Sequence, residues 1–378
     1  MKIIDSYSDQ ENYASAIGAT TRRDFLNQTA LFGALAVFSP HVLLAATRPQ
    51  KDRLGIALVG LGYYSTDVLA PAFAYTKNCY LAGVVTGTPA KAEAWKKKYN
   101  LADKNIYNYQ TFDQIANNPD IDVVYVVLPP SMHREYVERA AKAGKQVWCE
   151  KPMAPTVADC QAMIAACKKN KVALAIGYRC QHDPNVQEYM RLGRGKVFGE
   201  IKSVESVAGY TEGRTDHWKQ KRAMGGGVMG DMGVYAIQGA RLITGEEPVA
   251  VTAKLYTNRP RIYTEVEEIA DYTLEFPSGI TAKCHSSYGD NQNFLRATCE
   301  KGEIYVAPQQ GYNGIKGRSP QGDWHFPIKN QQALQMDDDA LAILQKKPLI
   351  APGEEGLRDI RVMEAVYRAG KSGKKETV

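Results

Sequence analysis

The chain has 378 residues, of which 44% are hydrophobic and 23% charged, and its formal net charge is +6. This composition excludes a disordered, collagen-like or disulfide-scaffold protein, and the length is enough for two domains with cores of their own. The charge excess is small and forms no long basic block, so we expect a soluble enzyme that does not bind nucleic acid.

Residues 1–46 have the features of an export signal. Arg22 and Arg23 stand in the stretch Thr-Arg-Arg-Asp-Phe-Leu, and the apolar run at 30–38 that follows is too short to span a bilayer. This order is typical of a twin-arginine signal, whose machinery exports folded proteins. We therefore expect a periplasmic protein with no membrane attachment after export. The alternative is that this segment is an ordinary amphipathic N-terminal helix. The sequence does not define where the signal would be cleaved.

Residues 47–53 are polar and are expected to form an arm, and residues 54–177 then alternate apolar strand-like runs with helical stretches. Alternation of this kind predicts a doubly wound parallel sheet of the Rossmann type. Strands are expected at 54–59, 80–85, 121–128, 146–149 and 172–177. Helices are expected between the first two strands, ending near residue 76, and at 91–99, 111–116, 133–143 and 157–170.

Strand-like runs dominate residues 178–378, which predicts an α+β substrate-binding domain built on a mostly antiparallel open sheet. The strands are expected at 201–208, 249–256, 269–276, 280–287 and 294–298, and the helices at 337–345 and 354–369. The strands at 269–276 and 280–287 mix Tyr, Cys, Leu and Phe with polar residues, enough for an apolar outer face. We therefore expect this domain to join copies of the chain.

The seven cysteines are an odd number and form no Cys-x-x-Cys pair. A disulfide framework or a zinc site needs closer or paired spacing, so the cysteines are expected to be buried thiols. His133, His182 and His217 share no metal-ligand spacing either, and we expect no metal.

A glycine loop follows the first predicted strand, with the order Gly60-Leu61-Gly62-Tyr63-Tyr64-Ser65. Glycine at the first two positions permits a tight turn and close approach of a pyrophosphate, while the following helix N-terminus favours negative charge. Ser65 takes the place of the usual third glycine and is small enough to keep the helix close to the strand. The position of the loop predicts dinucleotide binding.

The end of the second predicted strand indicates which dinucleotide binds. NAD sites place Asp or Glu there to accept the ribose hydroxyls, but this chain has Thr86, Gly87 and, shortly after, Lys91. Without a carboxylate, a 2′-phosphate is not repelled, and Thr86 and Lys91 can hydrogen-bond it. The cofactor is therefore expected to be NADP. The alternative is that Lys91 only solvates the start of a helix.

Three residues form the predicted catalytic group. Lys151, in Glu150-Lys151-Pro152, follows a predicted strand at the sheet edge where ligands bind. Asp231 and Tyr235 follow Gly225-Gly226-Gly227 and are four residues apart, so in a helix they share one face. A phenol is a poor base unless a nearby cation favours its deprotonation, which Lys151 can provide. The alternative is a glycine-rich turn before a half-buried helix.

These motifs together resemble the Gfo/Idh/MocA oxidoreductase family. Further segments are similar to its glucose–fructose oxidoreductase branch, namely Gly177-Tyr178-Arg179-Cys180, Asp183-Pro184, Thr244-Gly245-Glu246-Glu247-Pro248 and Pro352-Gly353-Glu354-Glu355-Gly356. Many relatives in the wider family carry histidine where this chain has Tyr235, so the tyrosine favours that branch. The likeness covers most of the chain.

The resemblance implies a sugar oxidoreductase in which hydride leaves C1 of an aldose, such as glucose, for tightly bound NADP, giving a lactone. A second sugar carbonyl, such as that of fructose, is then reduced. Tyr235 would transfer the proton, Lys151 would orient the sugar and Asp231 would bind a sugar hydroxyl. The resemblance also implies a homo-dimer or homo-tetramer.

The resemblance places two sets of binding residues. Cofactor-binding residues are expected at Gly60, Gly62, Tyr63, Tyr64, Thr86, Gly87, Lys91, Tyr109, Leu128, Pro129, His133, Glu150, Lys151 and Arg179. Sugar-binding residues are expected at Arg179, Trp218, Arg222, Asp231 and Tyr235.

Other functions stay open. One is a sugar dehydrogenase with an exchangeable cofactor, because residues 47–53 are shorter than the arm that folds over the cofactor in the glucose–fructose branch. Another is an NAD-dependent glycosidase of the same family. A non-catalytic sugar-binding protein is the third, and the presence of Lys151, Asp231 and Tyr235 argues against it.

Overall fold

The structure is a computed structural model and describes residues 51–312 and 314–378. The predicted signal at 1–46, with its paired arginines, lies outside the described residues, as does most of the predicted arm at 47–53. None of the helices in the described part of the chain is long and apolar enough to cross a membrane.

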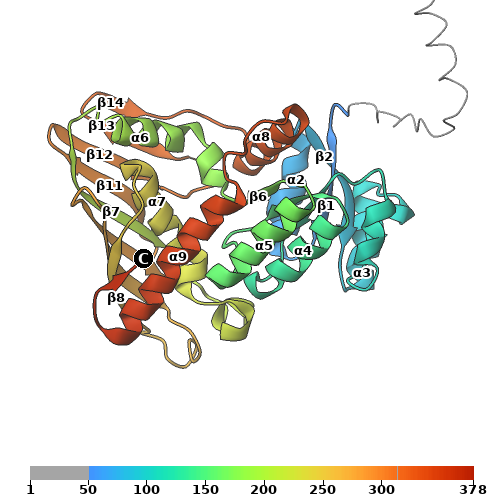
Figure 1. Cartoon of the computed structure of the whole chain (residues 1–378), viewed down its shortest axis with the longest axis horizontal. Helices are drawn as coiled ribbons and strands as arrows, with labels where there is room; N and C mark the ends of the chain where they lie inside the picture. The colour runs from blue at the N-terminus through green and yellow to red at the C-terminus, as the bar shows by residue number, and fades with distance from the viewer. Residues whose placement is uncertain (1–50, 313) are drawn as a thin grey trace, which may run out of the picture. The chain divides into compact units, whose positions relative to one another are not determined.

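The first domain is built on a six-stranded sheet whose paired strands all run parallel (Figure 1). The strands lie in the order β3-β2-β1-β4-β5-β6. Their bounds are β1 Leu54–Val59, β2 Cys79–Val85, β3 Ile106–Tyr107, β4 Val123–Val126, β5 Gln146–Cys149 and β6 Leu174–Ile176. The doubly wound parallel sheet predicted from the sequence is confirmed, although the two-residue strand β3 was not predicted.

Helices cover both faces of this sheet. Along β1, Ala57 and Val59 enter one core and Ile56 and Leu58 the other, because alternate side chains of a strand point to opposite faces. One face is covered by α4 (His133–Lys142) and α5 (Val157–Lys169). The other is covered by the helical segment at 64–75, which includes α2 (Ala70–Ala72), by α3 (Pro89–Tyr99) and by α8 (Gln331–Gln345). The helix expected at 111–116 is a 3₁₀ helix, Phe112–Asn117.

The second domain contains a nine-stranded sheet in which β7 and β10 pair in parallel and all other neighbours are antiparallel. The order is β14-β13-β12-β11-β7-β10-β9-β8-β15. The bounds are β7 Ile201–Gly209, β8 Ala250–Tyr256, β9 Ile269–Glu275, β10 Thr281–Ser287, β11 Asn293–Cys299, β12 Gly302–Ala307, β13 Lys316–Ser319, β14 Gly322–Trp324 and β15 Glu376–Thr377. The mostly antiparallel sheet is confirmed, and β12 to β15 are additions to the prediction.

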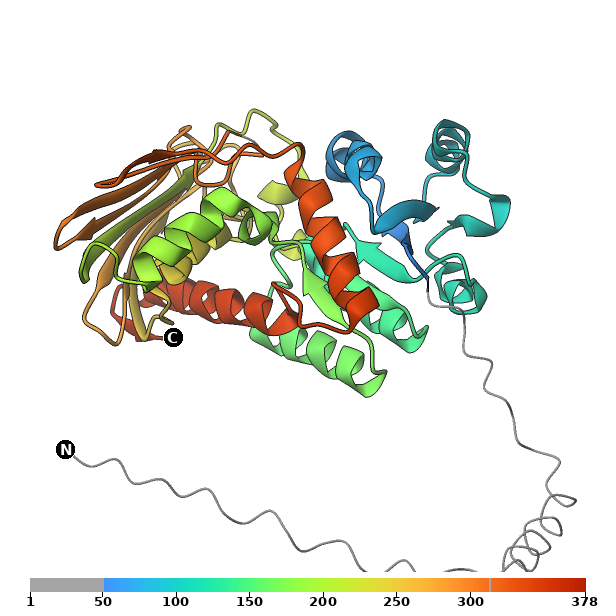
Figure 2. The same ribbon diagram turned by 90° about the horizontal axis from the view of Figure 1, so that it is seen from above.

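Helices α6 (Pro184–Arg194), α7 (Val234–Thr244) and α9 (Gly353–Ser372) pack against this sheet (Figure 2). Helix α9 also contacts α5 and β6, so it joins the two domains. Helix α6 was not predicted. All seven cysteines are buried and free, as expected from their spacing.

One expectation about the sheet is wrong. The apolar side chains Tyr272, Leu274 and Cys284 of β9 and β10 are buried in the core and do not form an outer face. Their alternating neighbours, such as Asp271 and Lys283, point outward, because residues two apart in a strand share a face. The outward face of these two strands is therefore polar.

Candidate active site

A cleft of about 950 Å³ opens at the carboxyl ends of the parallel strands and extends to the second sheet. It lies where β1 and β4 are neighbours and the strand order reverses, which is the usual ligand site of a doubly wound sheet. Most of the predicted binding residues line it: Gly60, Gly62, Tyr63, Tyr64, Thr86, Gly87, Lys91, Tyr109, Leu128, Pro129, Glu150, Lys151, Arg179, Trp218, Asp231 and Tyr235.

The glycine loop has the shape that a dinucleotide needs. Gly60 has φ +91°, and a Cβ there would lie 2.4 Å from the Val127 carbonyl oxygen, so only glycine fits. A Cβ on Gly62 would meet no atom within 4 Å, which leaves open space above the loop. Ser65 is buried, and its hydroxyl donates to the Gly60 carbonyl oxygen at 2.6 Å. The serine thus fits the third position and stabilises the turn.

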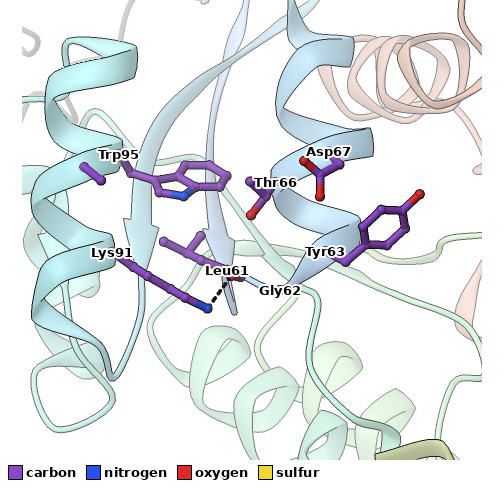
Figure 3. Close-up of a pocket in the computed structure, with 8 residues that line it drawn as sticks. Leu61, Gly62, Tyr63, Thr66, Asp67, Lys91 and Trp95 are labelled. Atoms are coloured by element: carbon purple, nitrogen blue, oxygen red, sulfur yellow. Dashed lines mark hydrogen bonds between the residues drawn. The ribbon is translucent and has the colours of Figure 1, made fainter. Parts of the chain in front are cut away.

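Polar groups surround the end of β2, where the adenosine part of a cofactor would lie. A smaller pocket of about 270 Å³ adjoins this end of the cleft. In Figure 3 Trp95 on α3 points toward Thr66 on the opposite helix, which also bears Asp67, and Lys91 extends toward Leu61. Lys91 Nζ donates to the Leu61 carbonyl oxygen at 3.1 Å, so the ammonium lies beside the glycine loop. With Thr86 also lining the cleft, these donors fit a 2′-phosphate.

Lys151, Asp231 and Tyr235 are brought together as predicted from the sequence. Lys151 Nζ donates to the Asp231 main-chain oxygen at 2.9 Å and to its Oδ1 at 3.2 Å. The same ammonium lies 4.5 Å from the centre of the Tyr235 ring. Asp231 is in the helical turn Met229–Gly233, and Tyr235 is in the first turn of α7.

Both members of the ion pair are held in their charged forms. Burial disfavours the Asp231 carboxylate, but Lys219 and Lys151 outweigh burial and hold its pKa well below the usual range. Burial likewise disfavours the Lys151 ammonium, but the neighbouring oxygens, those of Tyr235 and Asp231 foremost, raise its pKa above the usual range.

The Tyr235 hydroxyl has a different partner from the one expected. Lys151 lies over the ring, whereas Arg179 Nη2 donates to the hydroxyl oxygen at 3.2 Å. Arg179 is 3% exposed and is fixed by the main-chain oxygens of Gln310, at 2.6 Å, and Gly311, at 3.2 Å. The cation that contacts the phenol oxygen is therefore a rigidly held arginine.

Glu150 lies beneath this group and connects it to the sheet. Its Oε1 accepts a hydrogen bond from the Tyr125 hydroxyl at 2.6 Å, and burial raises the pKa of the carboxyl group. A Cβ on Gly177 would lie 2.7 Å from Glu150 Oε1, so glycine at that position leaves room for the carboxyl.

Two predicted residues do not line the cleft. His133 is fully buried, and its ring nitrogens lie 2.8 Å from the Leu128 carbonyl oxygen and 3.1 Å from that of Pro152. It therefore fixes the two segments that do line the cleft. The Arg222 guanidinium is bonded to the Glu265 carbonyl oxygen, and the residue is exposed outside the cleft.

The sequence reasoning missed part of the opposite wall. The additional lining residues on this wall are Gly209, Tyr210, Arg214, His217, Lys219, Met232, Asn293, Gln310, Gly311 and Tyr312. Lys219 had one available signal, because it follows the predicted sugar-binding residue Trp218. Its position depends on the triple glycine, since a Cβ on Gly226 would lie 2.5 Å from the Lys219 carbonyl oxygen. Tyr312 had no signal in the sequence, because its segment belongs to the second sheet and reaches the cleft only through the fold.

Comparisons with known proteins agree with this architecture. The family model described as an oxidoreductase family with an NAD-binding Rossmann fold matches residues 54–178, and a GFO/IDH/MocA C-terminal domain model matches residues 186–305. The solved structure of an aldose-aldose oxidoreductase from Caulobacter crescentus, complexed with glycerol, is 43% identical with a TM-score of 0.83. The match covers 86% of this chain and 100% of that one.

Two curated relatives are similar over most of their length. A D-xylose 1-dehydrogenase [NADP(+)] from Haloarcula marismortui is 26% identical over 96% of this chain and 98% of its own. An inositol 2-dehydrogenase from Rhizobium meliloti is 27% identical over 82% of this chain and 95% of its own. The fold and the cleft define an oxidoreductase with an NAD(P)-binding Rossmann domain. The chain belongs to the Gfo/Idh/MocA oxidoreductase family.

Proposed function

We propose that the protein oxidises an aldose at C1 to a lactone and reduces a second sugar carbonyl, with NADP as its cofactor. The similarity to the Caulobacter aldose-aldose oxidoreductase supports a sugar as both donor and acceptor. Glucose is the proposed donor, and fructose or a second aldose the acceptor. Bound nicotinamide would supply the chemistry of accepting a hydride from one sugar and delivering it to the next.

The observation that carries this proposal is the Tyr235 hydroxyl, which lines the cleft and accepts a hydrogen bond from Arg179. The phenol oxygen would take the proton of the C1 hydroxyl and later return it to the second sugar. Arg179 stabilises negative charge on that oxygen, and the Lys151 ammonium over the ring adds to the effect. Lys151 would also orient the sugar.

The role proposed for Asp231 is refined by its contacts. Oδ1 contacts Lys151 and Oδ2 contacts Lys219, so the main role of the carboxylate is to hold two ammonium groups in place. A sugar hydroxyl can donate to the remaining lone pairs. Trp218, which also lines the cleft, offers an apolar face for the sugar ring.

The NADP preference rests on Thr86 and Lys91 at the end of β2. Both line the cleft, and the segment from Thr86 to Lys91 that follows β2 contains no carboxylate, although Asp67 lines the adjoining small pocket together with Lys91. The name of the Haloarcula relative, a dehydrogenase of NADP(+), supports the same preference.

One experiment separates the proposal from its alternatives. The absorbance spectrum of the purified protein is recorded before and after adding glucose, with no added cofactor. We expect the band of reduced nicotinamide to appear and then to disappear when fructose or a second aldose is added. A band that needs added NADP would indicate an exchangeable cofactor, which the similarity to the xylose dehydrogenase favours. Release of sugar from a glycoside with no net reduction would indicate a glycosidase.

Export and assembly complete the proposal. Arg22-Arg23 before the apolar run supports export of the folded protein to the periplasm. Homo-oligomerisation through the second sheet is supported by an aromatic patch on β11 and β12. There Phe294 and Tyr305 stack with 5.9 Å between ring centres and Arg296 lies over both.

A further inference from the structure

Lys219 is the second ammonium group on the proposed catalytic carboxylate, and none of the proton and hydride transfers proposed above involves it. Its Nζ donates to Asp231 Oδ2 at 2.5 Å and to the Tyr210 hydroxyl oxygen at 2.9 Å. Its side chain is 16% exposed, close to the 13% of Asp231 and of Lys151. The three charges therefore share one desolvated environment, in which charge interactions are strong.

The contacts of Lys219 continue outward to a second ion pair. The Tyr210 hydroxyl has one proton, and Glu212 Oε2, at 2.8 Å, is a nearer acceptor for it than Asp231 Oδ2, at 3.2 Å. Glu212 in turn accepts from Arg214 Nε at 2.8 Å, and Arg214 holds the pKa of Glu212 at about 2 despite its burial. Because the tyrosine proton is directed to Glu212, Lys219 is the group that neutralises Asp231 Oδ2.

We propose that Lys219 is a positioning residue that fixes Asp231, and through it the Lys151 ammonium, in the geometry that the sugar reaction needs. This inference rests on the proposed function and extends it to a residue outside the family motifs quoted above. Two protons of Lys151 are directed to Asp231, one to the main-chain oxygen and one to Oδ1. The third proton remains for the sugar. Without Lys219 on Oδ2, the Asp231 carboxylate would be free to rotate about its side-chain bonds. The Lys151 ammonium would then move with Oδ1, and its third proton would no longer point at the sugar.

The groups around Asp231 also predict how its protonation would change if Lys219 were replaced. The groups that face it are Lys151 after β5, Lys219 in the 3₁₀ helix Trp218–Gln220, Tyr210 after β7 and Tyr288 after β10, with His217 further out. Only the two lysines carry positive charge, because burial and neighbouring cations lower the pKa of His217. Without Lys219, Asp231 is expected to take up a proton at a higher pH than in the native protein.

The test compares K219M with K221M as a matched control and K219R as a conservative variant. Lys221 is two residues away, its side chain is 48% exposed, and its one ion pair among residues 51–312 and 314–378 is with Asp216 at 3.4 Å. Each full-length protein is mixed with glucose at several pH values, and reduction of the bound cofactor is followed in a single turnover. Cofactor affinity and acid unfolding, by fluorescence and circular dichroism, are measured without sugar.

We expect K219M to slow reduction at saturating glucose about ten-fold to a hundred-fold, the effect of losing one charge-assisted hydrogen bond. The acid limb of its pH–rate profile should move toward neutral pH and K219R should restore the limb, while cofactor affinity stays unchanged. Acid unfolding of K219M should also begin at higher pH than that of K221M. The stability that Asp231 contributes through its lowered pKa is present above the unfolded-state pKa and is lost as the pH falls through the folded-state pKa. Without Lys219 the folded-state pKa lies closer to the unfolded one, so Asp231 contributes less stability and the smaller remainder is exhausted at a higher pH.

Two results would overturn the inference. One is a K219M profile that matches K221M in rate, acid limb and acid unfolding. The other is a slowed K219M whose acid limb is unmoved and whose rate K219R does not restore, which would show a purely structural role. If the native protein itself fails to reduce its cofactor with glucose, the proposed function falls. The acid-unfolding comparison then still decides whether Lys219 holds Asp231 charged.

Discussion

The sharpest prediction concerns the Tyr235 hydroxyl, which the substitution Tyr235→Phe removes while leaving the ring. The ring keeps its packing below the Lys151 ammonium, 4.5 Å from the ring centre. What is lost is one hydrogen bond, from Arg179 Nη2 at 3.2 Å, together with the only atom of the side chain that can carry a proton.

The structural cost of this substitution is small and the catalytic cost is large. Arg179 Nη2 keeps its bond to the Gln310 carbonyl oxygen at 2.6 Å, so no buried donor nitrogen is stranded by the change. The free energy of unfolding should therefore fall by about 1 kcal/mol. Loss of a general acid–base group slows the chemical step by about 10² to 10⁴, which corresponds to about 3–5 kcal/mol in the barrier.

The assay is single-turnover reduction of the bound cofactor by glucose, followed by its reoxidation with a ketose or a second aldose. Both steps should slow together, because the same oxygen accepts the proton in the first and donates it in the second. Tyr75→Phe is the control, since Tyr75 is 53% exposed and lies outside the cleft. Native rates in both steps for Tyr235→Phe would refute the assignment of this tyrosine as the proton-transfer group.

Four further outcomes are expected. Lys91→Ala should weaken NADP binding about ten-fold or more and spare NAD, because a charge-assisted phosphate contact contributes about 1.5–3 kcal/mol; equal losses in titrations with the two cofactors would place Lys91 away from the phosphate. Asp231→Ala should raise the KM for glucose and lower Tm, because Lys151 then lacks its buried partner, and steady-state kinetics with an unchanged KM would contradict this. Replacing Arg22 and Arg23 by lysine should retain the protein inside the cell, as cell fractionation would show, and normal export would argue against the twin-arginine signal. Light scattering should give a multiple of the chain mass of 41.8 kDa, and a monomer alone at micromolar concentration would count against assembly.

Local sequence patterns were enough for much of the first domain. The strands β1 and β5 begin and end at the predicted residues, because each is a buried apolar run bounded by polar residues or glycine. The glycine loop was equally predictable, since Gly60 needs a backbone conformation that other residues rarely adopt. Helix α6 was missed although its signal was present: Asp183 accepts from the Asn185 main-chain nitrogen, and proline occupies the first helical position.

The second sheet was less predictable than the first. The strands β13 and β14, at one end of the sheet, are only four and three residues long, too short for a hydrophobic period to stand out. The orientation of β9 and β10 was also misjudged. Alternation in a strand shows which residues share a face, but the direction of that face depends on the helices packed against the sheet, here α7 on β10 and α9 on the neighbouring β8.

The amino-acid sequence by itself determined every strand of the parallel sheet except the two-residue β3, the dinucleotide loop, and Lys151, Asp231 and Tyr235 as candidates for one group. These depend on interactions within a few residues or on a motif at fixed spacing. Only the tertiary structure decided that Arg179 contacts the phenol oxygen, that Lys151 lies over the ring and that Lys219 neutralises the far side of Asp231. The first two contacts join segments far apart in the chain, and the third crosses the triple glycine that separates Lys219 from Asp231. Hydrogen bonding and charge pairing depend on distances that only the folded chain fixes.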